Sequence, residues 1–566
     1  MKRRLLPILM TLVLVCALPI WAAFVTSGDV TNPLVCTAWA DTAEGERNSG
    51  TTQETFTEVT DETTLKKAVA DGKSVRMTQD ITLTSSLCIE KAVTLDMDGH
   101  VLTRMHTYEY DMVVIRSDAT LTLIDSNTGN LQHRFNAGET GWTKAADNAT
   151  GDGIVTVTGG VIYGDAGRSI INPCGIKILK GKLEMYGGSI VGIRNVYNAN
   201  GGGVYVSDQC TFNMYGGSIK GCYVFSDGGG VYVAAGGTFT MSGSSAITNC
   251  KGSRGGAVYN AGTFTMRDNS HIADCIYNSS IASGGGVHNK GTFTVEGGSI
   301  TGSVNDHNRE QSSDDICNEN KLDVSEGITI SCNVNVGYGG TISKGTFTGR
   351  VWIFWEGTIL GGTFTNEVIN YEGTIKAGEF TGEVTNTSGG TISGGTFDKN
   401  VANESGATIS GGTFNENVTN KTNATLNGGI FYGGVTNDGG KIEDGAYETV
   451  KFNSDNGAQA KEEKVLRGQK VAKPTDDPTK SGYTFIGWED ADGAYDFSKS
   501  VTAPLTLTAK WEKNPSSGGY YYYPTTDTKA DDTKGSPKTA DPGAALYGAL
   551  ALLSLTGMVA LNGKKR

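Results

Sequence analysis

The chain has 566 residues, enough for several domains, with a formal net charge of −13 and 19% charged residues. Glycine contributes 80 residues and proline only 11, without a Gly-X-Y period, which excludes collagen and favours short strands joined by tight turns. An acidic chain without basic clusters is a poor candidate for nucleic-acid binding or for adsorption to anionic lipid, because both depend on lysine and arginine.

Residues 1–40 have the pattern of a secretion signal. The basic segment KRR at positions 2–4 precedes an apolar core over residues 5–20. Small residues at Ala23 and Ala40 are compatible with cleavage after residue 23 or after residue 40. We therefore expect export of the chain, and we expect residues 41–54 to be disordered.

Residues 55–150 have the pattern of an N-terminal cap followed by the first strands of a larger sheet. Thr60 or Asp61 can cap a helix that ends before Gly72. The apolar face of this helix consists of Leu65, Ala68 and Val69. Such a helix would cover the open edge of the first strands, which otherwise invites aggregation.

Residues 151–335 contain a repeat whose period is about 27. The segments GIKI, GGGVYV, GGGVYV, GGAVYN and GGGVHN place their first apolar residue at Ile176, Val204, Val231, Val258 and Val287, in steps of 28, 27, 27 and 29. Two further apolar segments follow in each unit, separated by glycine-rich turns. Three short strands per unit, none of them long enough to form a sheet alone, predict one rung of a parallel β-helix.

Cys222, Cys250 and Cys275 hold one position of this repeat. Stacked rungs bring such thiols close together, but their Cβ vectors run parallel, which disfavours a disulfide. We interpret them as a row of buried thiols, with a disulfide and a metal site as the alternatives. Because no histidine lies at a matching spacing, zinc has little support. We expect neither a metal nor a cofactor.

Residues 336–447 contain a shorter repeat, T-I-x-x-G-T-F-x-x-x-V, whose period is about 17. Its phenylalanines recur once per unit and include Phe364, Phe380, Phe397, Phe414 and Phe431. Asparagine recurs two positions after the valine, at Asn370, Asn386, Asn403, Asn420 and Asn437. The pattern predicts a thinner solenoid with a stacked aromatic core. We interpret the asparagines as a ladder of amides bonded between rungs, with a polar ligand-binding row as the alternative.

A cap helix followed by such rungs resembles pectin-lyase-like right-handed β-helix proteins over roughly residues 55–340, and the segment LDMDGHVL resembles one of their early rungs. The resemblance implies a fold and no particular activity. The predicted fold class is therefore mostly β, a parallel β-helix or β-solenoid whose repeat period is about 27 and then about 17. A small module, a flexible linker and a hydrophobic C-terminal helix are expected to follow.

Residues 448–513 lack a short repeat and resemble a Listeria–Bacteroides repeat, a small β-grasp module of bacterial surface proteins. The residues that carry this resemblance are Pro474, the GYTFIGW run at 482–488, Phe497 and the closing LTLTAKW to Trp511. We expect Tyr483, Phe485 and Trp488 to form much of the core of the module. An exposed aromatic binding patch is the alternative.

Residues 514–535 are polar and rich in turn formers, which is typical of a linker. The end of the chain, residues 536–566, combines three features. It begins with Ser536, Pro537, Lys538, Thr539, Ala540 and Asp541, continues with an uncharged stretch over residues 544–562, and ends with GKKR. An uncharged stretch of this length can span a bilayer.

The hexapeptide resembles the sortase motif L-P-x-T-G of Gram-positive wall-anchored proteins. Pro537 and Thr539 match, whereas Ser536 and Ala540 replace leucine and glycine. The resemblance implies that a sortase cuts between Thr539 and Ala540 and joins the chain to peptidoglycan. The membrane would then be contacted only through the tail before processing. A retained membrane helix is the alternative.

Catalysis on polysaccharides needs carboxylates gathered in one groove, and in a solenoid these would recur at one position of the repeat. The repeat instead holds threonine, asparagine, glycine and serine. We interpret Asp314, Asp315 and Glu319 as part of a solvated irregular insertion, and Asp96 and Asp98 as turn residues. The sequence therefore predicts a non-enzymatic surface protein that binds a host or neighbouring-cell glycan or protein. A polysaccharide lyase or glycosidase is the alternative.

Overall fold

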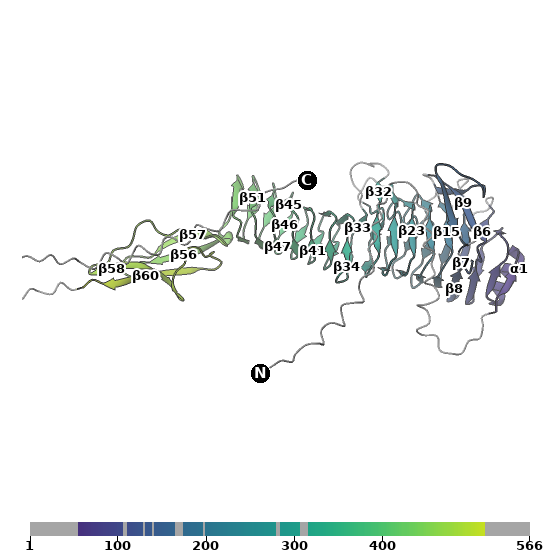
Figure 1. Cartoon of the computed structure of the whole chain (residues 1–566), viewed down its shortest axis with the longest axis horizontal. Coiled ribbons are helices and arrows are strands. Elements are labelled where there is room, and N and C mark those ends of the chain that lie inside the picture. The colour runs from purple at the N-terminus through teal and green to yellow at the C-terminus, as the bar shows by residue number, and fades with distance from the viewer. Residues whose placement is uncertain are drawn as a thin grey trace, which may run out of the picture.

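The computed structural model describes residues 55–105, 110–127, 129, 131–138, 141–164, 174–195, 199–278, 283–305 and 315–515. The chain is mostly β and forms an elongated parallel β-solenoid followed by a small β-domain, which confirms the predicted fold class (Figure 1). Helix α1 lies at one end of the solenoid (Figure 1). The predicted secretion signal, most of the linker and the sorting tail with its hydrophobic helix lie outside the described residues.

Two long parallel sheets run along the solenoid. Sheet A has 17 strands: β1 (Thr57–Val59), β2 (Val75–Met77), β5 (Val93–Asp96), β8 (Ala119–Ile124), β14 (Gly181–Met185), β18 (Thr211–Met214), β22 (Thr238–Met241), β26 (Thr263–Met266), β30 (Thr292–Val295), β34 (Lys321–Val324), β37 (Thr341–Ile342), β40 (Thr358–Ile359), β43 (Thr374–Ile375), β46 (Thr391–Ile392), β49 (Thr408–Ile409), β52 (Thr425–Leu426) and β55 (Lys441–Ile442). Sheet C has 15 strands: β4 (Leu87–Ile89), β7 (Val113–Ile115), β13 (Ile176–Ile178), β17 (Val204–Val206), β21 (Val231–Val233), β25 (Val258–Asn260), β29 (Val287–Asn289), β33 (Ile316–Asn318), β36 (Val334–Val336), β39 (Val351–Ile353), β42 (Val368–Tyr371), β45 (Val384–Thr387), β48 (Val401–Asn403), β51 (Val418–Lys421) and β54 (Val435–Asp438).

The third side of the solenoid changes where the repeat shortens. In the long rungs it is the 8-stranded sheet B: β3 (Ile81–Leu83), β6 (Val101–Arg104), β12 (Val161–Tyr163), β15 (Ser189–Val191), β19 (Ser218–Lys220), β23 (Ala246–Thr248), β27 (His271–Ala273) and β31 (Ser299–Thr301). The 5-stranded sheet E adds a short fourth segment: β16 (Arg194–Asn195), β20 (Tyr223–Val224), β24 (Lys251–Gly252), β28 (Ile276–Tyr277) and β32 (Val304–Asn305). In the short rungs it is the 7-stranded sheet F: β35 (Thr329–Ile330), β38 (Thr346–Phe347), β41 (Thr363–Phe364), β44 (Glu379–Phe380), β47 (Thr396–Phe397), β50 (Thr413–Phe414) and β53 (Ile430–Phe431).

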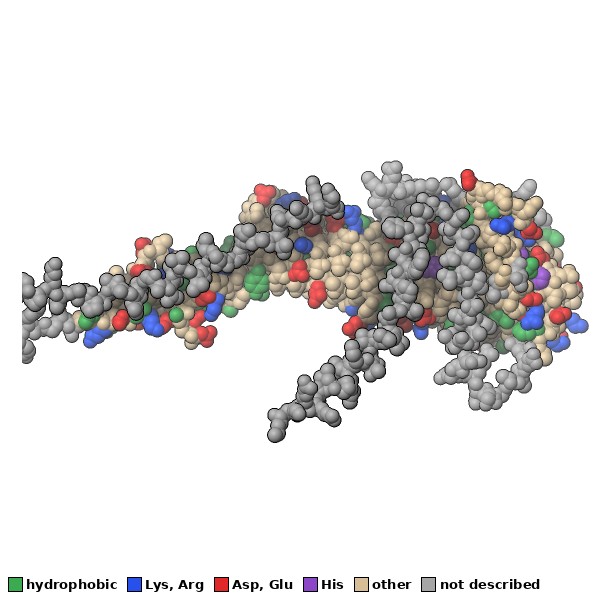
Figure 2. Space-filling model, in the orientation of Figure 1, with side chains coloured by type: hydrophobic (Ala, Val, Ile, Leu, Met, Phe, Trp, Pro, Cys, Tyr) green, Lys and Arg blue, Asp and Glu red, His purple; other side chains and the backbone are tan. Residues whose placement is uncertain are grey.

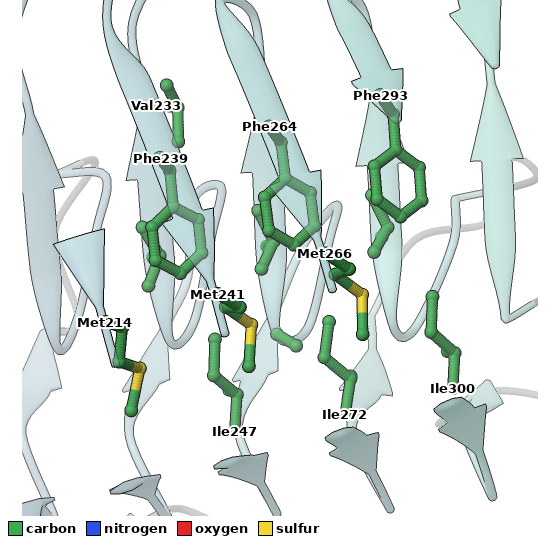
Figure 3. Packing of buried hydrophobic residues seen from close by; sticks show 14 of the residues in the cluster. Met214, Val233, Phe239, Met241, Ile247, Phe264, Met266, Ile272, Phe293 and Ile300 are labelled. Atoms are coloured by element: carbon green, nitrogen blue, oxygen red, sulfur yellow. The ribbon is translucent and has the colours of Figure 1, made fainter. Parts of the chain in front are cut away.

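Identical residues stack between rungs, because each strand pairs in parallel with the strand one repeat later. In the long rungs the rings of Phe212, Phe239, Phe264 and Phe293 stack on sheet A with centroids 4.7–4.9 Å apart. A row of methionines follows on the same strands, and a row of isoleucines from sheet B packs beside it (Figure 3). In the short rungs the row from Phe347 to Phe431 stacks on sheet F at 4.7–5.2 Å. The aromatic row therefore moves from one sheet to another where the repeat shortens.

Helix α1 (Glu62–Asp71) covers the first rungs. Asp61 accepts a hydrogen bond from the amide of Thr64 at 2.9 Å and so caps the helix. Leu65, Ala68 and Val69 are buried, and the helix ends at Gly72 in a left-handed conformation. These features confirm the helix that the sequence predicts.

A hairpin lies over the outside of the early rungs (Figure 1, where β9 marks it). It belongs to the 3-stranded antiparallel sheet D of β9 (Gln132–Gly138), β10 (Gly141–Lys144) and β11 (Ile154–Thr158). Trp142 is buried against the rung turn at Gly221, where any side chain would collide with the indole ring. Together with Phe135 and Tyr163, Trp142 forms a second small core outside the solenoid.

The C-terminal domain consists of the five-stranded sheet G, with the order β57–β56–β60–β58–β59. Its strands are β56 (Tyr447–Asn453), β57 (Lys461–Leu466), β58 (Tyr483–Asp490), β59 (Gly493–Ala494) and β60 (Leu505–Lys513). Residues 448–513, all of them described, contain no helix. Trp488 lies in the core and Phe485 packs against it, but Tyr483 is 38% exposed, so its predicted place in the core is wrong. Tyr483 begins strand β58 and is not among the residues packed in the core of the module.

Candidate functional site

An aromatic column runs along the outer face of sheet C in the long rungs. We define it as Tyr205, Tyr232, Tyr259 and His288. These side chains lie one per rung, at the middle position of β17, β21, β25 and β29. Consecutive rings stack with centroids 5.1, 5.1 and 5.2 Å apart and interplanar angles of 2–13°. Because strand side chains alternate, this row faces outward while the neighbouring valines face the core.

Charged groups flank the column. The guanidinium of Arg254 lies 5.1 Å from the centroid of the Tyr259 ring and pairs with both carboxylate oxygens of Asp227, at 2.9 and 2.6 Å. Lys177 lies 5.6 Å from the centroid of the Tyr205 ring, and its ammonium is 3.2 Å from Asp111. Asp227 and Asp111 are therefore each paired with a basic side chain, and these ion pairs lie beside the aromatic rings of the column.

The column becomes more buried toward the short repeat. Tyr205 and Tyr232 are half-buried, whereas Tyr259 and His288 are buried. Burial raises the pKa of Tyr259 to about 12, although the nearby Arg254 opposes the shift. Burial likewise lowers the pKa of His288, against an opposing effect of Glu319. The hydroxyls of the column are therefore neutral donors at physiological pH.

A second aromatic surface lies at the turns that join sheet C to sheet A in the first short rungs. We call Tyr338, Phe354, Trp355 and Tyr371 the aromatic turn patch. Tyr338 is 50% exposed and Trp355 is 43% exposed, with ring centroids 4.8 Å apart. Phe354 links the patch, since its ring lies 5.8 Å from Trp355 and 6.4 Å from Tyr371. Large rings therefore lie in solvent on three successive rungs.

Two residues of this patch have a backbone conformation that bulky side chains avoid. Tyr338 has φ 50° and Trp355 has φ 34°, both in the left-handed region. The next two rungs place Glu372 and Ser388 in this conformation at the equivalent turn position, with φ 62° and 50°. The left-handed conformation costs on the order of 1–2 kcal/mol for a non-glycine residue. Folding alone gives no reason for exposed aromatic residues at these positions.

A shallow groove of about 730 Å³ runs along the corner between sheets A and F. Its floor includes Gly345, Gly362, Gly378 and Gly395, and threonines such as Thr363 line it. Glycine is required at these positions because the neighbouring rung and the stacked phenylalanines leave no room for a side chain. Gly362, for example, has φ 110°, and a Cβ there would lie 3.0 Å from the carbonyl oxygen of Gly345 and 3.4 Å from the Phe364 ring. Besides hydroxyl and backbone groups, Glu326, Glu379 and Lys344 line the groove, and no aromatic ring does.

The predicted asparagines lie at one corner of the solenoid, and their amides bond from rung to rung. Each Nδ2 donates to the Oδ1 of the next asparagine, at 2.7–2.9 Å, along the series Asn370, Asn386, Asn403, Asn420 and Asn437. A second series, Asn260, Asn289 and Asn318, makes the same contacts in the long rungs at 2.8 and 2.7 Å. Sequence reasoning missed this series, although the repeat VYN, VHN, ICN shows it. In both series the amides serve to join neighbouring rungs.

The cysteine row lies in the core. Cys222, Cys250 and Cys275 are fully buried thiols, and each Sγ lies 3.3–3.6 Å from the carbonyl oxygen two residues earlier. Burial raises the pKa of Cys222 and Cys250 well above the usual value. Such thiols are weak nucleophiles and pack as small apolar groups.

Two of the acidic residues expected in a solvated insertion are in fact buried. Asp315 is buried and accepts hydrogen bonds from the amides of Ser303 and Asn333, at 3.0 and 3.2 Å. The side chain of Glu319 is largely buried and pairs with Lys290 at 2.9 Å. The segment between them forms β33 in sheet C, so the prediction of an irregular solvated loop is wrong for these two residues. Asp314 lies outside the described residues.

The early acidic residues hold turns together. Asp96 is buried, accepts from the amides of Asp98 and Ser126, and pairs with Arg76 at 2.8 Å. Asp98 itself lies in a turn with φ 43°. Both side chains therefore have the turn role that the sequence indicates. Their neighbour Asp125 accepts from two glycine amides at 2.7 and 2.8 Å.

The six residues of the sorting motif, Ser536, Pro537, Lys538, Thr539, Ala540 and Asp541, lie outside the described residues. Within the ranges that the structure describes, no helix has both the length and the apolar character needed to cross a membrane.

Comparison with known proteins identifies one part of the chain. Residues 449–510 match the family model of the Listeria-Bacteroides repeat domain. This match coincides with sheet G and confirms the resemblance of that segment. No curated protein and no solved structure matches the chain.

Proposed function

We propose that this chain is a non-enzymatic protein displayed on a Gram-positive cell wall, where it binds a glycan through the aromatic turn patch. Three sequence features support display: the secretion signal, the linker and the sortase-like tail. The Listeria-Bacteroides repeat domain at residues 449–510 lies between the solenoid and that tail in the sequence. The solenoid would then be held away from the wall as a rigid rod.

The observation that carries the binding proposal is the exposed pair Tyr338 and Trp355. Both rings lie in solvent, and both residues hold a left-handed backbone conformation. Strained residues that the fold does not need point to a functional constraint. Contiguous exposed apolar surface likewise marks interaction sites on soluble proteins.

A glycan fits this surface better than an apolar partner does. The face of an aromatic ring carries partial negative charge and attracts the C–H groups on one side of a pyranose. Glu356 and Glu372 lie beside the rings in the same turns, and their carboxylates can accept hydrogen bonds from sugar hydroxyls. On the face of the solenoid shown in Figure 2, acidic and basic side chains are interspersed.

The test compares glycan binding by the purified chain and by Trp355→Gly on a glycan array and then by calorimetry. Glycine relieves the backbone strain, so we expect Trp355→Gly to unfold at the same or a higher temperature. Binding should fall about five- to thirtyfold, as expected when a stacking contact worth about 1–2 kcal/mol is lost. Tyr432→Ala is the matched control, because Tyr432 is 47% exposed on the same solenoid and lies outside the patch. Equal binding by wild type and Trp355→Gly would refute the proposed site.

Display on the wall is tested separately. Walls of the producing cell are digested with a muralytic enzyme, and the C-terminal peptide of the released protein is identified by mass spectrometry. We expect a chain that ends at Thr539 joined to a peptidoglycan fragment. A chain that ends at Arg566 in the membrane fraction would contradict wall anchoring. Shortening of the bound glycan during incubation would favour the polysaccharide-active alternative.

A further inference from the structure

Three potential metal ligands meet where the long rungs end. His288 lies at the middle of β29, and Cys317 lies in register with it at the middle of β33, one rung later. Glu319 follows two positions after Cys317. One donor atom from each side chain lies within 4.8 Å of the other two. The stacking of rungs thus brings together residues that are far apart in the sequence.

His288 is poorly satisfied by its protein surroundings. Its side chain is 1% exposed, and neither ring nitrogen makes a well-formed hydrogen bond to a described residue. Nε2 lies 3.2 Å from Glu319 Oε1, and stacking on Tyr259 holds the ring in place. A buried donor or acceptor without a good partner costs about 1–3 kcal/mol and calls for an explanation.

Asn335, which lies two rungs beyond His288 in the same row, also has an unsatisfied polar atom. Asn335 pairs in register with Cys317, is buried, and has an Oδ1 without a hydrogen-bond partner among the described residues. Two poorly satisfied polar side chains therefore lie on either side of Cys317, which is itself only 3% exposed.

The carboxylate of Glu319 is shared between two neighbours. Lys290 contacts Oε2 of Glu319 at 2.9 Å, so Oε1 remains on the side of His288.

We propose that His288, Cys317 and Glu319 bind a thiophilic divalent transition-metal ion of the Zn²⁺ class. Nitrogen, sulfur and carboxylate oxygen are the ligands that zinc prefers, and three protein ligands leave one position for water. On binding, the S–H bond of Cys317 breaks, a sulfur–metal bond forms, and the proton passes to solvent. The thiolate and the carboxylate then balance the charge of the ion.

Such an ion would join two rungs at the junction of the two repeats. On the next strand of sheet C, His288 pairs with Cys317, which follows it in the sequence by one long repeat. Cys317 in turn pairs with Asn335, which follows it by one short repeat. The aromatic core row changes sheets at the same place. A metal bound to both rungs stabilises the folded junction, because the unfolded chain cannot hold the three ligands together.

The experiment measures Zn²⁺ and Co²⁺ binding to the intact chain by equilibrium dialysis and absorption spectroscopy. We expect one ion per chain, a sulfur-to-cobalt charge-transfer band, and a higher unfolding temperature with the metal. His288→Tyr restores the tyrosine found in the three preceding rungs, so it should fold normally while binding the ion at least about tenfold more weakly. Cys317→Ser should abolish the charge-transfer band.

Cys88→Ser is the matched control, because Cys88 occupies the same outward row of sheet C near the other end and should leave binding unchanged. Two results would overturn the proposal: failure of the wild-type chain to take up either ion, or unchanged affinity in His288→Tyr. In both cases His288 and Glu319 would only contact each other. This site is independent of the aromatic turn patch, so either proposal can fail alone.

Discussion

Removing one amide from the middle of the asparagine ladder should cost far more stability than removing one from its end. Asn403 donates to Asn420 Oδ1 at 2.8 Å and to the carbonyl oxygen of Thr425 at 3.2 Å, and it accepts from Asn386 at 2.9 Å. Asn403→Ala deletes all three hydrogen bonds. At roughly 0.5–1.5 kcal/mol each, the loss is about 1.5–4.5 kcal/mol.

Asn437→Ala provides the internal comparison. Asn437 closes the same ladder, but it is exposed, so water can replace its contacts. We expect its loss to cost at most about 1 kcal/mol. Both variants delete the same chemical group, so the difference isolates the effect of burial.

The measurement is urea unfolding followed by circular dichroism, with the dependence on denaturant checked to be unchanged. Solenoid rungs depend mainly on their neighbours, so hydrogen exchange of the amides in β48 and β51 gives a local readout of the same loss. If Asn403→Ala unfolds no more easily than Asn437→Ala, the ladder does not contribute through buried hydrogen bonds, and the argument fails.

The core and the cap give three further predictions. Phe397→Ala should destabilise the short rungs by about 3–5 kcal/mol and Phe397→Leu by clearly less, measured by the same unfolding assay, because the ring is fully buried between two others at 4.7 and 4.8 Å. The thiol of Cys250 should react with a maleimide only as fast as the chain unfolds, since burial raises its pKa and excludes the reagent; rapid labelling of the native chain would contradict its position. Burial opposes ionisation of Glu62, but hydrogen bonds from Lys66 and Thr84 lower its pKa from 4.5 to about 2. The folded pKa is depressed, so its stabilising effect is present above pH 4.5 and is lost as the pH falls toward 2, and Glu62→Gln should flatten the acid limb of the stability profile in that window.

The repeat alone was enough to predict most of the solenoid. Once Val258 and Val287 are recognised as equivalent, every residue between them acquires a partner one rung away, and alternation then assigns its face. The cap helix was equally predictable, because Asp61 and Gly72 mark its two ends. These features depend on local chemistry repeated many times, which a single sequence displays directly.

The candidate sites were harder to predict, because they depend on departures from the repeat. Trp355 occupies a turn position that holds Glu372 and Ser388 in the next two rungs, so a consensus sequence of the repeat discards the tryptophan. His288 and Cys317 have no evident relation in the sequence until the rung register aligns them with Tyr259. A candidate functional residue is therefore best recognised by aligning the repeats and finding the residue whose type differs from that of the equivalent residues in neighbouring rungs.

The C-terminal module shows a different reason for error. A register shift between Phe485 and Gly487 changes the alternation within β58, so that Phe485 and Trp488 pack together although their positions differ in parity. Ile486 consequently points into solvent and is exposed. A bulge of this kind is set by pairing with β60 and leaves no local pattern.

The same module also packs against the last rung of the solenoid. Its resemblance to an independent repeat domain did not predict this contact. The amide of Phe431, the last ring of the aromatic row, donates to the carbonyl oxygen of Arg467 at 2.8 Å, and Gln469 donates to the carbonyl oxygen of Phe431. Gly468 packs directly on Phe431, where a side chain would clash with its backbone. Stacked parallel strands leave an unpaired edge at each end, and an open edge invites association with other chains. Helix α1 covers the first edge and the β56–β57 hairpin protects part of the last one, so the rod can expose a long lateral surface while hiding its ends.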